Sequence, residues 1–132
     1  MDATSKRILE YLTEVEEAAE DVLTNKQQIV DLDAKRNRNR EALSALRNDI
    51  PDSEKVKVCF GNMFIKLPKS KTREMIQRDQ EQLDKEINDL RKGLKAKVNH
   101  LQELQGKPEL RGYSLSPLSA DEIKAINSLL KR

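Results

Sequence analysis

Apolar residues recur every three or four positions in the first third of the chain, which is the spacing of a helix that packs against another helix along a narrow stripe. The members of this stripe are Ile8, Leu12, Val15, Ala19, Val22, Ile29, Leu43 and Leu46. Ile50 and Pro51 follow, and proline stops a helix. The pattern therefore predicts a helix from about residue 4 to about residue 48. At about 1.5 Å per residue it is roughly 65 Å long, which exceeds the usual helix of a globular domain.

A second stripe with the same spacing lies in the second half of the chain. Its members are Ile76, Leu83, Ile87, Leu90, Leu94, Val98, Leu101 and Leu104. Gly106 and Pro108 come directly after it, and both residue types are typical of a helix end. Residues 68–72 have the composition of a loop in which Ser70 can cap the helix. We therefore expect the second helix from about residue 71 to residue 105.

Charged residues interrupt the first stripe, where Asp33, Arg36 and Arg40 occupy positions that the spacing would give to apolar side chains. Two helices joined by a compact connection should pack antiparallel, and we take the register that places Leu43 opposite Ile76. The charged pairs that this register brings together are Arg36 with Asp84, and Arg40 with Asp79 or Gln80. Such a polar layer can fix the register of a coiled coil at a cost in stability.

Between the helices, residues 55–67 alternate as a β-hairpin does, with Gly61 and Asn62 as the turn. The apolar residues that share a face of their strand are Val56, Val58 and Phe60 in the first strand, and Met63, Ile65 and Leu67 in the second. A lone hairpin is marginal in water and exposes two edges, and nothing else in the sequence reads as a strand that could cover them. We therefore expect assembly with hairpins of other chains through Val56, Val58, Phe60, Met63, Phe64, Ile65 and Leu67.

The C-terminal segment, residues 106–132, is expected to form a loop and then a short helix at about 120–131. Ser119 and Glu122 have the spacing of a capping box. The apolar face of this helix comprises Ile123, Ile126, Leu129 and Leu130. Such a face must pack against another surface of the protein. The obvious candidate is the far end of the coiled coil at Ile8, Leu9 and Leu12.

The composition agrees with long paired helices. Hydrophobic residues make up 36% of the chain, aromatic residues 3% and charged residues 36%, which leaves little material for a globular core. The net charge of +2 argues neither for nor against a polyanionic partner. One cysteine, Cys59, excludes an intrachain disulfide, and neither an apolar signal region nor a membrane-spanning run is found. We expect a soluble protein of the cytoplasm or the nucleus.

Three segments carry a resemblance to the β-type subunits of the prefoldin family. They are Ile29-Val-Asp-Leu-Asp-Ala-Lys-Arg-Asn-Arg-Asn-Arg-Glu41, Val58-Cys-Phe-Gly-Asn-Met-Phe-Ile-Lys66 and Gln105-Gly-Lys-Pro-Glu-Leu110. The expected fold is mainly α: a long antiparallel two-helix coiled coil joined by one β-hairpin, with a short C-terminal helix. Residues 1–105 would form the prefoldin-like helix–hairpin–helix domain, and residues 106–132 a C-terminal extension.

The resemblance implies a hetero-hexamer with other prefoldin and prefoldin-like subunits, whose hairpins form the body and whose coiled coils hold non-native client proteins. It further implies work with RuvB-like AAA+ ATPases and RNA polymerase assembly factors. The candidate client contacts at the coiled-coil end are Ile8, Leu12, Leu101 and Leu104. Minimal β-type subunits end soon after the second helix, so the extension here puts direct client contact in doubt if it covers that end, and favours a scaffold role.

Two other functions remain open from the residues themselves. A self-assembling coiled-coil adaptor without chaperone activity would have the same helices. A nucleic-acid-binding coiled coil would use the basic run at residues 35–40, but Asp31, Asp33 and Glu41 flank this run and no aromatic residue lies within it. Catalysis and cofactors find no support, because His100 has no second histidine or cysteine near it and no glycine-rich phosphate loop is present.

Overall fold

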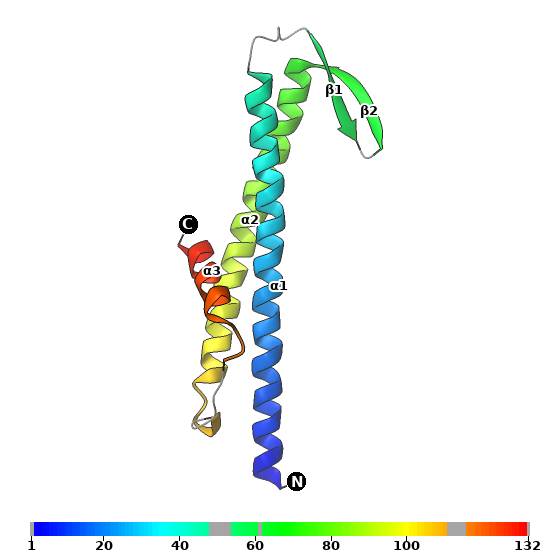
Figure 1. Cartoon of the computed structure of the whole chain (residues 1–132). Coiled ribbons are helices and arrows are strands. Elements are labelled where there is room, and N and C mark those ends of the chain that lie inside the picture. Colours follow the sequence, from blue (N-terminus) through cyan, green and yellow to red (C-terminus); the bar gives the residue numbers. More distant parts are fainter. Residues whose placement is uncertain (1, 48–53, 61, 111–115, 132) are drawn as a thin grey trace. The chain divides into compact units, whose positions relative to one another are not determined.

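The computed structural model describes residues 2–47, 54–60, 62–110 and 116–131 (Figure 1). Its elements are, in order, α1 (Ala3–Leu46), β1 (Lys55–Phe60), β2 (Met63–Pro68), α2 (Lys69–Gln105), the 3-10 turn η1 (Pro108–Leu110) and α3 (Ala120–Leu130). Two long helices joined by one antiparallel hairpin, with a short C-terminal helix, confirm the fold class predicted from the sequence. The predicted end of the first helix at residue 48 lies outside the described residues.

The chain forms two compact units. The terminal unit comprises Met1–Val30 and Asn88–Arg132, and therefore holds the first part of α1, the last part of α2 and α3. The hairpin unit comprises Asp31–Ile87, with the end of α1, both strands and the start of α2. No helix within residues 2–47, 54–60, 62–110 and 116–131 is long and apolar enough to cross a membrane.

Buried and half-buried residues recur along α1 at alternating intervals of three and four residues. They include Val15, Ala18, Val22, Asn25, Ile29, Leu32, Arg36, Asn39, Leu43 and Leu46. This is the spacing of a coiled-coil seam, in which each helix turns one narrow stripe toward its partner. Most of the core is apolar, but three members of the stripe carry amide or guanidinium groups. The seam therefore continues through a polar stretch without a break in its spacing.

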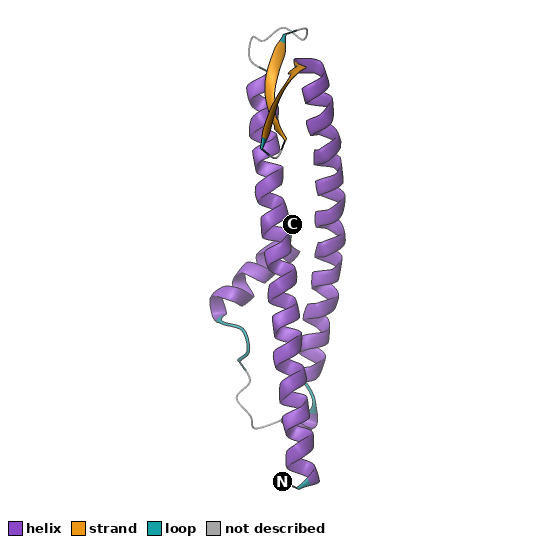
Figure 2. Cartoon of the chain, turned by 90° about the vertical axis from the view of Figure 1, so that its right-hand side faces the viewer, coloured by secondary structure: helices purple, strands orange, loops and turns teal. Residues whose placement is uncertain are grey.

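Strand β2 leads directly into α2 (Figure 2), so the predicted loop over residues 68–72 is wrong. The backbone N–H of Lys69 donates to the Glu54 carbonyl at 2.8 Å, and the Thr72 hydroxyl donates to the Pro68 carbonyl at 3.1 Å. The first bond satisfies one of the N–H groups that a helix start leaves free. Ser70 therefore lies within the helix and does not cap it, because the base of the hairpin supplies an acceptor.

Helix α3 begins with the capping box that the sequence predicts. The Glu122 N–H donates to Ser119 Oγ at 3.1 Å, and the Ser119 N–H donates to Glu122 Oε1 at 2.8 Å. These two bonds satisfy two backbone donors at the start of a helix of only three turns. The cap thus stabilises a helix that is too short to be stable alone.

Helix α3 does not pack at the place predicted from the sequence, the far end of the coiled coil. Within the terminal unit it lies along α2, where Ile123 and Ile126 share a cavity with Val98 and Leu101. Leu9, which was expected beneath it, remains 48% exposed. The expected docking at Ile8, Leu9 and Leu12 is therefore wrong. The apolar face of α3 instead covers a side of α2 next to the seam.

The capping box makes the start of α3 sensitive to acid. The hydrogen bond from the Ser119 backbone is the main cause that holds the pKa of Glu122 below its ordinary value of 4.5. A lowered pKa in the folded state means that this stabilisation is present above pH 4.5 and is lost as the pH falls through the folded value. We expect the Ser119 amide resonance, followed by NMR, to move upfield on acidification with a midpoint below pH 4.5. Glu122→Gln should abolish this titration, and a midpoint at or above 4.5 would contradict the bond.

Candidate functional site

The hairpin presents one apolar face. Its register pairs Val56 with Leu67, Val58 with Ile65 and Phe60 with Met63. Residues that face each other across an antiparallel pair lie on the same side of the sheet. Met63 is 63% exposed and Ile65 37% exposed, although both are large apolar side chains. Six of the seven candidate assembly residues thus share one side of the sheet, and Met63 and Ile65 on this side are exposed.

Phe64 lies on the opposite face, where it pairs with Cys59, next to the pair of Lys57 and Lys66. It is 74% exposed. Side chains alternate along a strand, so the position of Phe64 between Met63 and Ile65 was sufficient to predict this separation. Phe64 therefore does not belong to the same surface as the other candidate assembly residues.

The hairpin carries two strand edges. Within the described part of the chain, the sheet holds β1 and β2 alone, so each strand pairs on one side. Unpaired edges with an apolar face invite pairing with another strand. Strands of another chain can therefore pair with both edges of the hairpin, and apolar side chains of that chain can cover one face.

Polar side chains cross the helix pair in the hairpin unit. Arg36 Nη1 donates to Asp84 Oδ1 at 3.0 Å, and Arg36 Nη2 bonds Asp33 on the same helix. Burial by itself lowers the pKa of Arg36, but the hydrogen bonds to both carboxylates outweigh it and raise the pKa above its ordinary value. The guanidinium is therefore always charged and is held by two acceptors.

The second expected pair is not formed. Asp79 Oδ2 accepts from Asn39 Nδ2 at 2.7 Å, and the Arg40 side chain is exposed. The steps of three and four along α1 place Asn39 on the seam and Arg40 beside it. The predicted contact of Arg40 with Asp79 or Gln80 is therefore replaced by one from Asn39. The contacts of residues 36 and 39 with 84 and 79 run in opposite directions, as antiparallel helices require.

The stripe predicted from the sequence omits two polar residues of the seam, Asn25 and Asn39. Asn25 is 3% exposed, and its Nδ2 donates to the Leu90 carbonyl at 2.8 Å in the terminal unit. Gln80 donates to the Arg36 carbonyl at 3.0 Å in the hairpin unit. The signal for Asn25 was its place between Val22 and Ile29 at steps of three and four. Counting only apolar residues left it out.

The four candidate client contacts lie in the terminal unit. Ile8 and Leu12 are half-buried on α1, while Leu101 is 4% exposed and Leu104 6% exposed on α2. Lys107 also reaches α1, since its ammonium lies 5.7 Å from the centre of the Tyr11 ring. Leu101 and Leu104 therefore pack largely within the unit in this structure.

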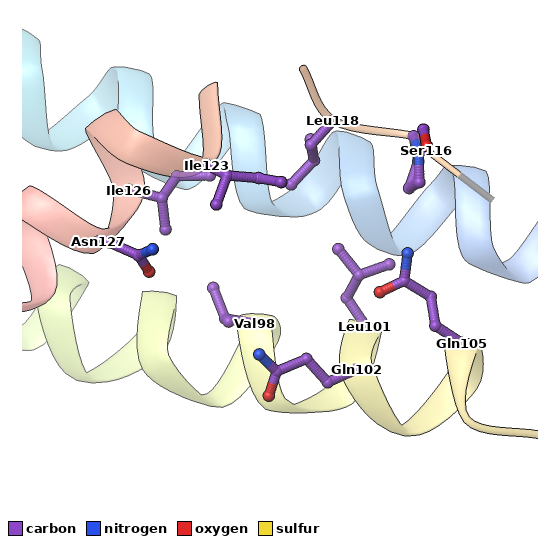
Figure 3. Close-up of a pocket in the computed structure, with 10 residues that line it drawn as sticks. Val98, Leu101, Gln102, Gln105, Ser116, Leu118, Ile123, Ile126 and Asn127 are labelled. Carbon is purple, nitrogen blue, oxygen red and sulfur yellow. The ribbon is translucent and has the colours of Figure 1, made fainter. Parts of the chain in front are cut away.

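A cavity of about 230 Å³ lies between α2 and the segment that ends in α3 (Figure 3). Val98 and Leu101 border it from α2, and Leu118, Ile123 and Ile126 border it from the tail. Figure 3 shows these side chains on its two sides, with Gln102 and Gln105 at one margin. The tail thus covers α2 incompletely.

The residues described here include no group of three or more histidine, cysteine, aspartate or glutamate side chains placed to hold a metal ion. Cys59 forms no disulfide and is exposed on the hairpin.

A family model described as "Prefoldin subunit" matches residues 9–109 of this chain. A Mus musculus protein called "p53 and DNA damage-regulated protein 1" is 65% identical over 127 residues, which cover 96% of each chain. The Homo sapiens protein of the same name is 62% identical over 127 residues, with the same coverage. Among solved structures, the prefoldin beta subunit from Thermococcus strain KS-1 matches with a TM-score of 0.70. The match is 19% identical and covers 88% of this chain and 100% of that chain, so it concerns the fold.

We expect the two arginines of the polar stretch to respond differently to substitution. Arg36→Leu should raise the free energy of unfolding by about 1 kcal/mol, because a leucine continues the seam and both carboxylates can reach water. The matched substitution Arg40→Leu, on the exposed side, should change it by less than about 0.5 kcal/mol. Urea unfolding followed by circular dichroism measures both.

The proposed register role of Arg36 needs a second readout. Distances between spin labels on α1 and α2 within the hairpin unit should broaden in Arg36→Leu and stay narrow in Arg40→Leu. Unchanged distributions together with reduced stability in Arg36→Leu would contradict a register-fixing role.

Proposed function

The chain belongs to the prefoldin subunit family, and from this premise we propose that it is a non-catalytic subunit of a prefoldin-like co-chaperone complex. Its hairpin joins it to other prefoldin and prefoldin-like subunits in a hetero-oligomer. The complex helps to hold or scaffold non-native proteins during the folding and assembly of larger complexes.

The observation that carries the proposal is the apolar face of the hairpin. Met63 and Ile65 expose 63% and 37% of their surface, and each strand has an edge that is open for pairing. Burying one such side chain contributes about 1.5–3 kcal/mol, and a two-stranded sheet gains further stability when strands are added. Another hairpin of the same kind supplies both an apolar face and free edges.

The wider set of partners rests on the resemblance alone. It includes RuvB-like AAA+ ATPases, RNA polymerase assembly factors and non-native clients, and any use of ATP belongs to the ATPase. Leu104 is buried within the terminal unit, which disfavours a direct grip at this residue.

Ile65→Lys should remove the other subunits from a tagged pull-down of nuclease-treated extract, analysed by mass spectrometry. A charged side chain on this face would be buried without a partner in the joint. Helical circular dichroism should be retained, since Ile65 lies in neither helix. The loss of co-purified subunits should exceed tenfold.

The matched control is Val30→Lys, because Val30 is an apolar residue of α1 that is 41% exposed, close to the 37% of Ile65. This variant should recover the same subunits as the unmodified chain. Retention of all subunits by Ile65→Lys would show that the hairpin is not the joint. Recovery of the unmodified chain alone, as a homo-oligomer, would favour a coiled-coil adaptor.

A further inference from the structure

The cavity beside α3 has a buried apolar floor and an exposed polar rim. The floor is formed by Leu101, Leu118 and Ile126, which are 4%, 9% and 3% exposed. At the rim, Ile123 is 47% exposed, so the cavity is reached from solvent beside an apolar side chain. Figure 3 shows Ile123 and Leu118 across from Val98 and Leu101, with the space between them.

The described polar residues that line this cavity are all uncharged. They are Gln102, Gln105, Ser116 and Asn127. Charged residues make up 36% of the chain, yet none of those in the described ranges borders the cavity. Three of the four groups are exposed, and Gln105 is half-buried. Amides and a hydroxyl can both donate and accept hydrogen bonds, which is what a peptide backbone requires.

The size of the cavity fits one large apolar side chain. Its volume of about 230 Å³ exceeds the roughly 150 Å³ of a dry apolar cavity that holds a benzene ring. A leucine or phenylalanine side chain therefore fits on the floor, and the peptide groups on either side of it would reach the rim. A charged or phosphorylated ligand finds no counter-charge among the described lining residues, and taking its charge out of water would be unfavourable.

We propose that this cavity is a client site that takes one leucine or phenylalanine side chain from an uncharged, extended segment of a non-native protein. The inference rests on the proposed co-chaperone function and specifies where this subunit makes contact. Non-native chains expose such segments, whereas folded proteins bury the side chain and pair the backbone. The site is built by α3 and the segment before it, so the C-terminal extension creates the contact surface.

The experiment uses the whole 132-residue chain with methyl-labelled isoleucine, leucine and valine, observed by NMR. The probe is a neutral peptide, acetyl-Gly-Ser-Gly-Leu-Gly-Ser-Gly-amide, and its control replaces the leucine by alanine. The leucine peptide should shift the methyl resonances of Val98, Leu118 and Ile123. The alanine peptide should bind at least tenfold more weakly, because it leaves most of the floor uncovered.

Two variants at equally exposed residues locate the binding. Ile123→Glu places a charge at the cavity, and Leu9→Glu places one near the other candidate contacts on α1, where Leu9 is 48% exposed. The first should weaken the leucine peptide at least tenfold, and the second should leave its affinity unchanged within twofold. Val98→Phe, which fills the cavity, should weaken it like Ile123→Glu. Circular dichroism checks the fold of each variant. If Val98→Phe unfolds, the comparison of Ile123→Glu with Leu9→Glu is sufficient to test the site.

Three results would overturn the inference: no methyl shift with the leucine peptide, equal binding by Ile123→Glu, or weakening by Leu9→Glu. The proposed function has its own readout, since Ile123→Glu should still recover the other subunits in the pull-down. If the Ile65→Lys variant loses its partners and the leucine peptide causes no methyl shift at the cavity, the subunit role is supported and the client site is rejected.

Discussion

The narrow seam between α1 and α2 is the constraint on which the remaining structure depends. Steps of three and four residues place one stripe of each helix in the interface, and the other faces stay in water. A chain that is 36% charged can fold in this way because so few positions need to be apolar. Exposed large apolar residues lie singly on α1, at Leu9 and Val30, and otherwise on the hairpin and at Ile123 of α3. The hairpin and α3 carry the functional proposals because the seam does not bury these side chains.

The polar members of the seam limit which register the helices adopt. Asn25 reaches the Leu90 carbonyl in the terminal unit, and Arg36 reaches Asp84 in the hairpin unit. A shift of one helix by a single turn would bring another backbone carbonyl to Asn25, but it would separate Arg36 from Asp84, so the side-chain pair discriminates between registers. Because β2 continues directly into α2, the register of the two helices also fixes the position of the start of α2, and of the hairpin attached to it, along α1 within the hairpin unit.

Much of the fold could be predicted from local patterns, and the differences have identifiable causes. The two stripes, the hairpin and the capping box of α3 all follow from short-range spacing. The sequence pairs Asp79 with Arg40 because a step of four residues from Arg36 reaches Arg40, whereas the seam takes a step of three to Asn39. The start of α2 was placed after Ser70 because the acceptor for Lys69 comes from Glu54, which is distant in sequence. The cavity beside α3 depends on where the tail docks, and no local pattern contains that information.

The central claim is that strands of other subunits cover the hairpin. Amide hydrogen exchange, read by mass spectrometry on peptides spanning residues 54–68, tests it most directly in the isolated chain and in the purified hetero-oligomer. The account predicts exchange within seconds to minutes in the isolated chain and protection of at least a hundredfold in the oligomer, because edge amides become paired. Equal exchange of these peptides in both samples would contradict the account.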